Sequence, residues 1–192
     1  MKSISRILQD SYVENLISHY RKVWGSNYHL LKFDKGPIEK FPDKFQIIEF
    51  SPQGSKNYWI YATVGMSFYF PKQPIELHIF SPTKERGLLE ILYSVVHFHW
   101  YERQLNLLHI VNFGKGWIKS SACSYGLIQL PYIDGPAVEI FNFEPYEVHC
   151  YWLLPITENE RDFKKKYGFD SLVEIFEKKQ INYIDPNRNS LV

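Results

Sequence analysis

The chain has 192 residues, a length that fits one domain built around one hydrophobic core. Hydrophobic residues make up 45% of it and aromatic residues 17%, which excludes an intrinsically disordered chain. Its 22 Lys and Arg against 21 Asp and Glu give a net charge of +1, without the basic excess typical of proteins that bind nucleic acid directly. The two cysteines, Cys123 and Cys150, exclude a disulfide framework and indicate a reducing compartment.

The N-terminal residues lead into an amphipathic stretch, without the apolar region typical of a signal peptide. No run of residues reaches the roughly 18 apolar positions that a membrane-spanning helix needs. We therefore expect a cytoplasmic protein with no membrane association, folded as a single domain over residues 1–192.

The first part of the chain changes from a helical pattern to strand-like patterns. Apolar residues at helical spacing predict an amphipathic helix over residues 4–24. Short β-like runs separated by turn residues follow. These predicted strands cover residues 28–33, 45–50 and 58–64.

Residues 75–80 alternate between apolar and polar positions. The apolar Ile75, Leu77 and Ile79 share one face, and Glu76 and His78 share the other, which predicts a half-buried strand. From residue 83 to residue 103 the period becomes helical. The apolar stripe is wide there, so we expect a well-buried helix.

Further strands are predicted at residues 125–130, 137–143 and 146–154. Thr157 and Glu160 then form a capping-box pattern that begins a short helix, and a last helix is predicted over residues 170–180. Strands do not alternate regularly with helices along the chain. This order predicts an α+β fold with a mixed or mostly antiparallel sheet flanked by helices.

No residue pattern predicts a metal or cofactor site. His97 and His99 lie two positions apart in a predicted helix, so their side chains point to different faces. There is no HExxH motif, and neither cysteine has a ligand at zinc spacing. We expect no metal ion and no cofactor.

No catalytic residues are predicted either. The segment that begins at Gly65 starts like a G-x-S-x-G nucleophile elbow, but Tyr69 occupies the position of the second glycine. Cys150 lies in an apolar alternation that predicts a buried thiol, whereas Cys123, among serines, could be exposed without an evident activating base. A hydrolase that uses Ser67 or Cys123 remains an alternative to a non-enzymatic protein.

One charge pattern is unusual. Between residues 120 and 160 there is no Lys or Arg, while six acidic residues occur. The ordinary interpretation of this pattern is a sheet face exposed to solvent. The alternative is an acidic surface that binds a basic partner. On the alternative, the partner-binding residues are the acidic Asp134, Glu139, Glu144 and Glu147, with Tyr132, Tyr146 and Tyr151 as anchors.

Several segments are similar to one known family. The sequence YATVGMS at residues 61–67 resembles the T-x-G-M-S segment of the suppressor of fused (SUFU) domain family, and PIELHI at 74–79 resembles the strand after it. The sequence WLLPITENE at 152–160 resembles the family's L-x-P-I-x-x-x-E block. Tyr167-Gly168 and Pro186-Asn187-Arg188 are similar to its closing part.

The resemblance implies an α+β domain without enzymatic activity. Eukaryotic members bind a transcription factor whose peptide adds as a strand, and small bacterial members resemble immunity proteins of polymorphic or LXG-type toxin systems. The length of this chain favours a bacterial immunity protein, or antitoxin, whose partner is a cognate toxin. A nuclease domain is one candidate for that toxin. A peptide- or transcription-factor-binding module without a toxin is the alternative.

Overall fold

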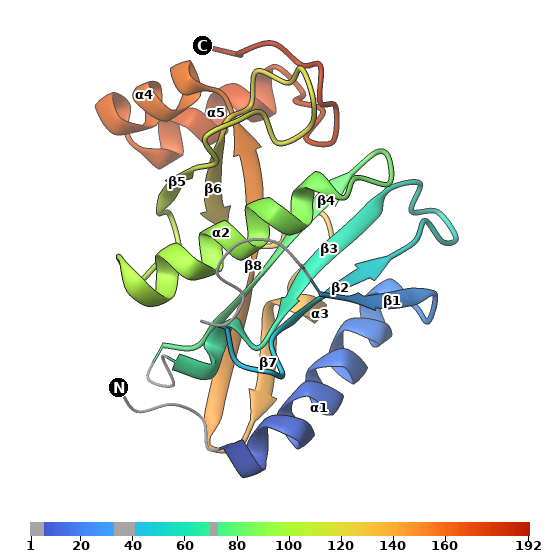
Figure 1. Cartoon of the computed structure of the whole chain (residues 1–192). Coiled ribbons are helices and arrows are strands. Elements are labelled where there is room, and N and C mark those ends of the chain that lie inside the picture. The colour runs from blue at the N-terminus through green and yellow to red at the C-terminus, as the bar shows by residue number, and fades with distance from the viewer. Residues whose placement is uncertain (1–5, 33–40, 70–72) are drawn as a thin grey trace.

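The computed structural model describes residues 6–32, 41–69 and 73–192 (Figure 1). Eight strands of the described residues form one sheet in the order β1-β2-β3-β4-β8-β6-β5, with β7 paired to β8. β4 and β8 are parallel, and the other six pairs are antiparallel. The strands are β1 (Tyr28–Leu31), β2 (Gln46–Phe50), β3 (Trp59–Val64), β4 (Ile75–Ser81), β5 (Ile110–Asn112), β6 (Tyr125–Gln129), β7 (Ile140–Phe143) and β8 (Tyr146–Ile156).

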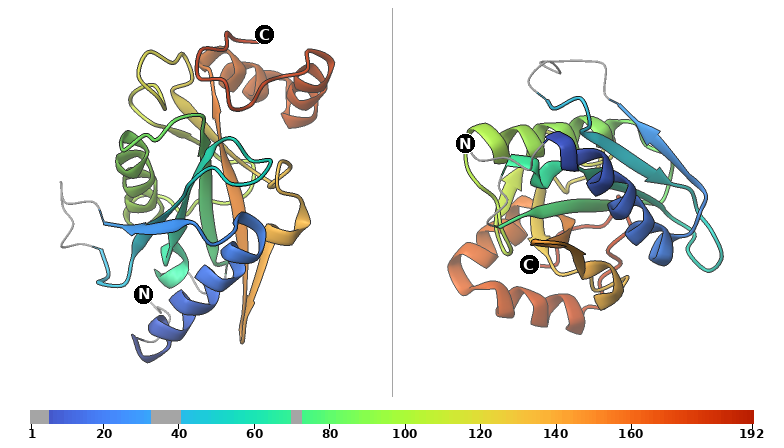
Figure 2. Two further views of the ribbon diagram at one scale, coloured as in Figure 1. Left: turned by 90° about the vertical axis from the view of Figure 1, so that its right-hand side faces the viewer. Right: turned by 90° about the horizontal axis from the view of Figure 1, so that it is seen from below.

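Helices cover both faces of this sheet and one of its ends (Figures 1 and 2). The long α1 lies against one face and α2 against the other, while α4 and α5 pack together at one end. The predicted α+β fold with a mixed sheet is confirmed. The helices are α1 (Arg6–Trp24), the 3-10 helix η2 (Met66–Tyr69), α2 (Gly87–Tyr101), α3 (Pro136–Glu139), α4 (Glu158–Tyr167) and α5 (Phe169–Lys178).

Two hydrophobic cores lie on the two sides of the sheet, and the alternation of β8 supplies both. Cys150 and Trp152 point into the core beneath α1, whereas Tyr151 and Leu153 point into the core beneath α2. Trp152 is fully buried. Since successive side chains of a strand point to opposite faces, a strand buried on both sides must be apolar at almost every position.

The prediction of a half-buried strand at residues 75–80 is wrong. All seven residues of β4 are buried, including Glu76 and His78. β4 lies near the middle of the sheet between β3 and β8, where α1 covers the face that carries these two polar side chains. The two polar side chains of this strand do not form a solvated face: Glu76 accepts hydrogen bonds inside the fold, whereas neither ring nitrogen of His78 has a hydrogen-bond partner among the described residues.

The predicted strand at 137–143 is only partly correct. Its first residues form α3, because Gly135 adopts a positive φ of 72° and Pro136 begins a helical turn. The three-residue β5 has too short a pattern to have been predicted, and the predicted start of the first helix at residue 4 lies outside the described residues. Cys123 is buried, so the expectation that it could be exposed is wrong.

The capping box is confirmed at the start of α4. The Thr157 hydroxyl accepts a hydrogen bond from the amide of Glu160 at 3.3 Å, and the Glu160 carboxylate accepts one from the amide of Thr157 at 2.8 Å. Each helix end leaves four backbone groups without intrahelical partners, and these bonds satisfy two of them. None of the helices in the described residues has both the length and the apolar character to cross a bilayer.

Candidate partner-binding surface

Half of the acidic residues between 120 and 160 are neutralised by cations from outside that segment. Asp134 is paired with Lys56 at 2.8 Å, and its side chain is buried. The two acidic residues at the start of α4 are also paired, Glu158 with Arg161 and Glu160 with Arg188. Asp134 is therefore not available to a partner as the sequence predicted, because it holds two loops of the chain together.

The remaining three carboxylates lie around the hairpin formed by β7 and β8. Glu144 occupies the turn of this hairpin, and Glu147 lies on β8 opposite Asn142. Both are exposed, and Glu139, at the end of α3, is partly exposed. No lysine or arginine of the described residues forms an ion pair with them, and the nearest basic group is the ring of His149, 3.6 Å from Glu147.

The three predicted anchor tyrosines do not share a surface with one another. Tyr132 is 58% exposed, whereas Tyr151 is only 6% exposed and stacks on His149 at 5.5 Å. Tyr146 is partly buried on the α1 side of β8, the face opposite to that of Tyr151. Burial and, to a smaller extent, the charge of Glu139 raise the pKa of Tyr151. The surface therefore consists of Glu139, Glu144 and Glu147 and is called the hairpin surface below.

The most elaborate polar arrangement in the described residues surrounds Glu76, which is fully buried. Its carboxylate accepts a hydrogen bond from the Thr63 hydroxyl at 2.6 Å, from the Ser67 hydroxyl at 2.8 Å and from the Tyr12 hydroxyl at 2.9 Å. The amides of Gly65, Met66 and Ser67 donate three more, at 3.1–3.2 Å. Burial raises the pKa of Glu76, and the bonds from Thr63, Ser67 and Tyr12 oppose this shift.

This arrangement explains the segment at residues 61–67 structurally. Gly65 has a φ of +101°, and a Cβ atom there would lie 2.4 Å from the Phe68 ring, so the turn that aims three amides at Glu76 requires glycine. Ser67 is fully buried and hydrogen-bonded to both Glu76 and Tyr12. It is not placed to attack a substrate.

Neither cysteine is activated. Burial raises the pKa of Cys123 and raises that of Cys150 still further, with the charge of Glu76 as a second cause for Cys150. A thiolate is therefore disfavoured at both positions. Within residues 6–32, 41–69 and 73–192, no group of three or more His, Cys, Asp or Glu side chains is arranged to hold a metal ion.

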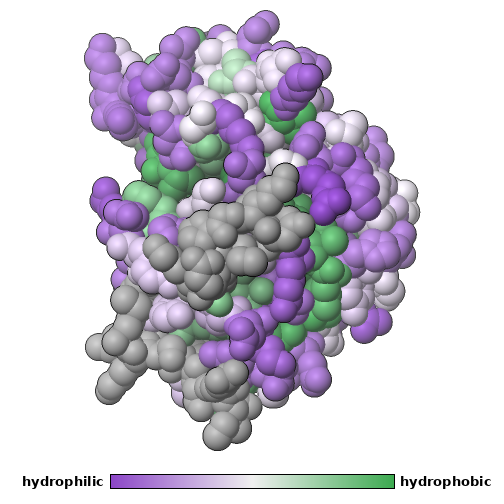
Figure 3. All heavy atoms as spheres, viewed as in Figure 1, coloured by the Kyte–Doolittle hydropathy of each residue, from purple (hydrophilic) through white to green (hydrophobic). Residues whose placement is uncertain are grey.

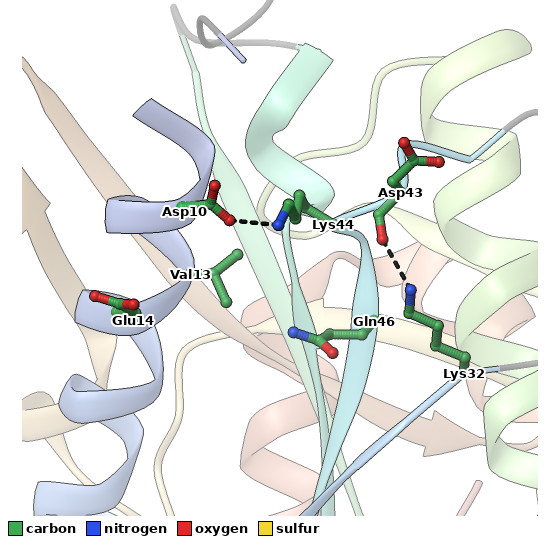
Figure 4. Close-up of a pocket in the computed structure, with 7 residues that line it drawn as sticks. All are labelled: Asp10, Val13, Glu14, Lys32, Asp43, Lys44 and Gln46. Carbon is green, nitrogen blue, oxygen red and sulfur yellow. Dashed lines mark hydrogen bonds and ion pairs between the residues drawn. The ribbon is translucent and has the colours of Figure 1, made fainter. Parts of the chain in front are cut away.

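A surface pocket of about 420 Å³ lies between α1 and the start of β2 (Figure 4). One ion pair and one hydrogen bond lie across it: Lys44 lies 2.5 Å from Asp10, and the Lys32 ammonium donates to the backbone carbonyl of Asp43 at 3.0 Å. The lining lacks the apolar character typical of small-molecule sites. The remaining residues that line it are Val13, Glu14 and Gln46.

Within residues 6–32, 41–69 and 73–192, the sheet also has strand edges that pair with no further strand. β1 and β5 are its two ends, and β7 pairs only with β8. Leu30 on β1 is 45% exposed, and Leu108, just before β5, is 37% exposed. On the face seen in Figure 3, apolar surface gathers in two patches, one near β5 and one farther to the right in the view. Such edges can accept an extended segment of another chain.

The fold, a mixed eight-stranded sheet with helices on both faces, is that of an α+β protein. Its most elaborate polar arrangement is buried inside the fold, so the candidate functional sites are on the exposed surfaces. The chain belongs to the suppressor of fused (SUFU) family, whose model matches residues 42–189. None of the curated proteins matches it.

Solved structures with the same fold agree with this assignment. A protein described as a SUFU homologue from Neisseria gonorrhoeae has a TM-score of 0.84 and 29% identity, covering 95% of this chain and 98% of its own. A Sufu–Fu complex structure has a TM-score of 0.68 at 10% identity, covering 94% and 92%. Drosophila Suppressor of Fused has a TM-score of 0.65 at 10% identity, covering 94% of this chain and 51% of its own.

Proposed function

We propose that this protein is a non-enzymatic, cytoplasmic immunity protein that neutralises a cognate toxin by binding it directly. The observation that carries the proposal is the hairpin surface, where two exposed carboxylates and a partly exposed one have no lysine or arginine partner among the described residues. Paired or buried acidic residues serve the fold, but unpaired exposed ones are free to meet a basic partner. The family supports a binding role, since one related structure is that of a Sufu–Fu complex.

A nuclease domain fits this surface as the partner. A nuclease must attract the phosphate backbone and therefore carries basic groups in its cleft. An acidic inhibitor surface presents the same sign of charge as the nucleic acid and accelerates association through its long-range field. Tyr132, exposed on the loop between β6 and α3, is the one predicted anchor tyrosine that is open to a partner.

The experiment that tests this function is capture of the bound chain. The tagged protein is purified from its native host, and the co-purifying chain is identified and expressed with and without the immunity protein. We expect a toxin domain that stops growth when expressed alone and is harmless when both are present. Capture of a chain that has no toxicity would overturn the immunity role.

A peptide- or transcription-factor-binding module is the second candidate. The unpaired edges of β1 and β5 favour it, because strand addition needs an open edge and no toxin. A toxin-like gene directly upstream of this one favours the first function, and its absence favours the second. The hydrolase alternative has lost its support, because Ser67 and Cys123 are both buried.

A further inference from the structure

Glu49 is a buried carboxylate that the fold does not satisfy. It lies on β2 with its side chain fully buried, on the same sheet face as its β3 neighbour Tyr61. Neither carboxylate oxygen accepts a hydrogen bond of ordinary geometry from the described residues. This contrasts with Glu76, whose carboxylate accepts six, and with Glu160, which is held by an arginine.

The cation beside Glu49 comes from a surface loop. The Lys84 ammonium lies 2.9 Å from Oε1 of Glu49 and 5.0 Å from the centre of the Trp59 ring. The Lys84 side chain is 54% exposed and belongs to the segment between β4 and α2, so it covers the carboxylate from the solvent side. Glu49 supplies a carboxylate and Trp59 supplies an indole face. These two kinds of group recognise a basic side chain.

An ammonium group does not fill this arrangement. Lysine is a compact point charge and pairs here with one oxygen of Glu49, Oε1, and not with both. A guanidinium is planar, donates two parallel hydrogen bonds to a carboxylate and stacks on an indole. The site therefore matches arginine better than the lysine that occupies it.

Tyr61 on β3 and His29 on β1 are the neighbours of Glu49 on the two adjacent strands. Burial raises the pKa of Tyr61, and the charge of Glu49 and a close polar contact of the Tyr61 hydroxyl with that carboxylate raise it further, so the hydroxyl remains protonated beside Glu49. Across from Glu49 on β1 lies His29, which is exposed. The side chains around Glu49 thus reach the surface at the β1 edge of the sheet.

We propose that Glu49 and Trp59 form a subsite for an arginine side chain of a binding partner, and that Lys84 occupies this subsite in the free protein. The partner's arginine displaces Lys84, whose exposed ammonium returns to solvent. The physiological role of the subsite rests on the proposed partner-binding function, but the chemistry of the subsite does not. It lies on β2 and β3, apart in sequence from the hairpin surface.

The test uses N-acetyl-arginine amide as the probe and N-acetyl-citrulline amide, its neutral analogue of the same shape, as the comparison. Binding is followed by NMR through the indole NH of Trp59, which is assigned with Trp59→Phe. In Lys84→Ala we expect the arginine probe to bind at least about ten-fold more tightly than in the wild type. We expect citrulline to cause no comparable change, and Glu49→Gln in the Lys84→Ala background to abolish binding.

Lys115→Ala is the matched control, since Lys115 pairs with Glu90 on the surface and its loss should create no site. Equal binding of arginine and citrulline, or no gain in Lys84→Ala over Lys115→Ala, would overturn the proposal. If Lys84→Ala does not fold, Lys84→Met keeps the aliphatic stem, and the wild type against Glu49→Gln gives the same comparison. If the arginine probe does not bind, the subsite proposal fails, but the result of partner capture still stands. If no toxin is captured, the proposed function fails, but the result with the probe still stands.

Discussion

Arg188 and Glu160 form a buried, two-point ion pair between the C-terminal segment and α4. The guanidinium donates to the two oxygens of Glu160 at 2.6 and 2.8 Å and to the carbonyl of Pro155 at 3.0 Å. Glu160 also accepts the amides of Thr157 and Leu191. One carboxylate thus fixes the start of α4 and the last residues of the chain.

Replacing Arg188 with alanine should destabilise the fold strongly. The change leaves the Glu160 charge buried without its cation, which typically costs about 3–5 kcal/mol. The measurement is the free energy of unfolding in urea. Arg161→Ala is the control, because Arg161 pairs with Glu158 and Asp162 at the surface. A loss for Arg188→Ala no larger than for this control would contradict the assignment.

Glu76→Gln should also destabilise the fold, by about 3 kcal/mol or more. The amide nitrogen of glutamine would face donors that now point at a carboxylate oxygen, so several buried groups would lose their acceptor. Urea unfolding measures the effect, with Glu147→Gln as the exposed control. If both variants unfold at the same urea concentration, the six hydrogen bonds do not stabilise the protein as described.

Stability should fall as the pH falls from about 6.5 to about 4. Burial lowers the pKa of His78 and of His99 from 6.5 to about 4 in the folded protein. The unfolded chain therefore binds more protons in that window, and each histidine withdraws about 3 kcal/mol of stability across it. Unfolding free energies measured from pH 4 to pH 7.5 report this slope.

His78→Phe tests the contribution of one of these two histidines. The His78 ring packs against Trp24 and Phe80 at 5.2 and 5.3 Å, so phenylalanine fits the aromatic surroundings without a titratable group. We expect the free energy of unfolding to depend less steeply on pH, because only one of the two histidines still contributes to the slope. His29→Gln, at an exposed position on β1, is the control for replacing a histidine at the surface. An unchanged slope in His78→Phe would show that His78 does not titrate in this window.

Reversing the charges of Glu139, Glu144 and Glu147 to lysine should weaken binding of the captured partner, by about ten-fold or more, and make the remaining affinity less sensitive to salt. The measurement is the dissociation constant at two ionic strengths. The control reverses three exposed acidic residues of α5, Asp170, Glu174 and Glu177, and so makes the same change in net charge. Equal weakening by both triple variants would show that net charge matters and the hairpin surface does not.

The parts of the fold that the sequence predicts are those with local signals. The capping box at Thr157 and Glu160 depends on residues three positions apart, and the long alternation of β8 depends on its own side chains. Both are confirmed. The burial of Glu76 depends on Tyr12, which is 64 residues away, and no local pattern reports such a contact.

The candidate surface shows the same limit. The absence of Lys and Arg between residues 120 and 160 can be read from the sequence. Which cations neutralise the acidic residues there depends on the three-dimensional fold. Lys56 reaches Asp134 across 78 positions, and Arg188 reaches Glu160 across 28. Glu139, Glu144 and Glu147 have no lysine or arginine partner among the described residues, and His149 lies 3.6 Å from Glu147.

The parallel pairing of β4 with β8 affects how the protein must be made. During synthesis β4 emerges early, but its neighbour on one side is absent until β8 has been translated, since Ile75 lies opposite His149. Until then the nascent chain carries an open, apolar strand that is prone to mispairing, and non-local pairings of this kind form slowly. A truncated product that ends before β8 therefore cannot complete the centre of the sheet.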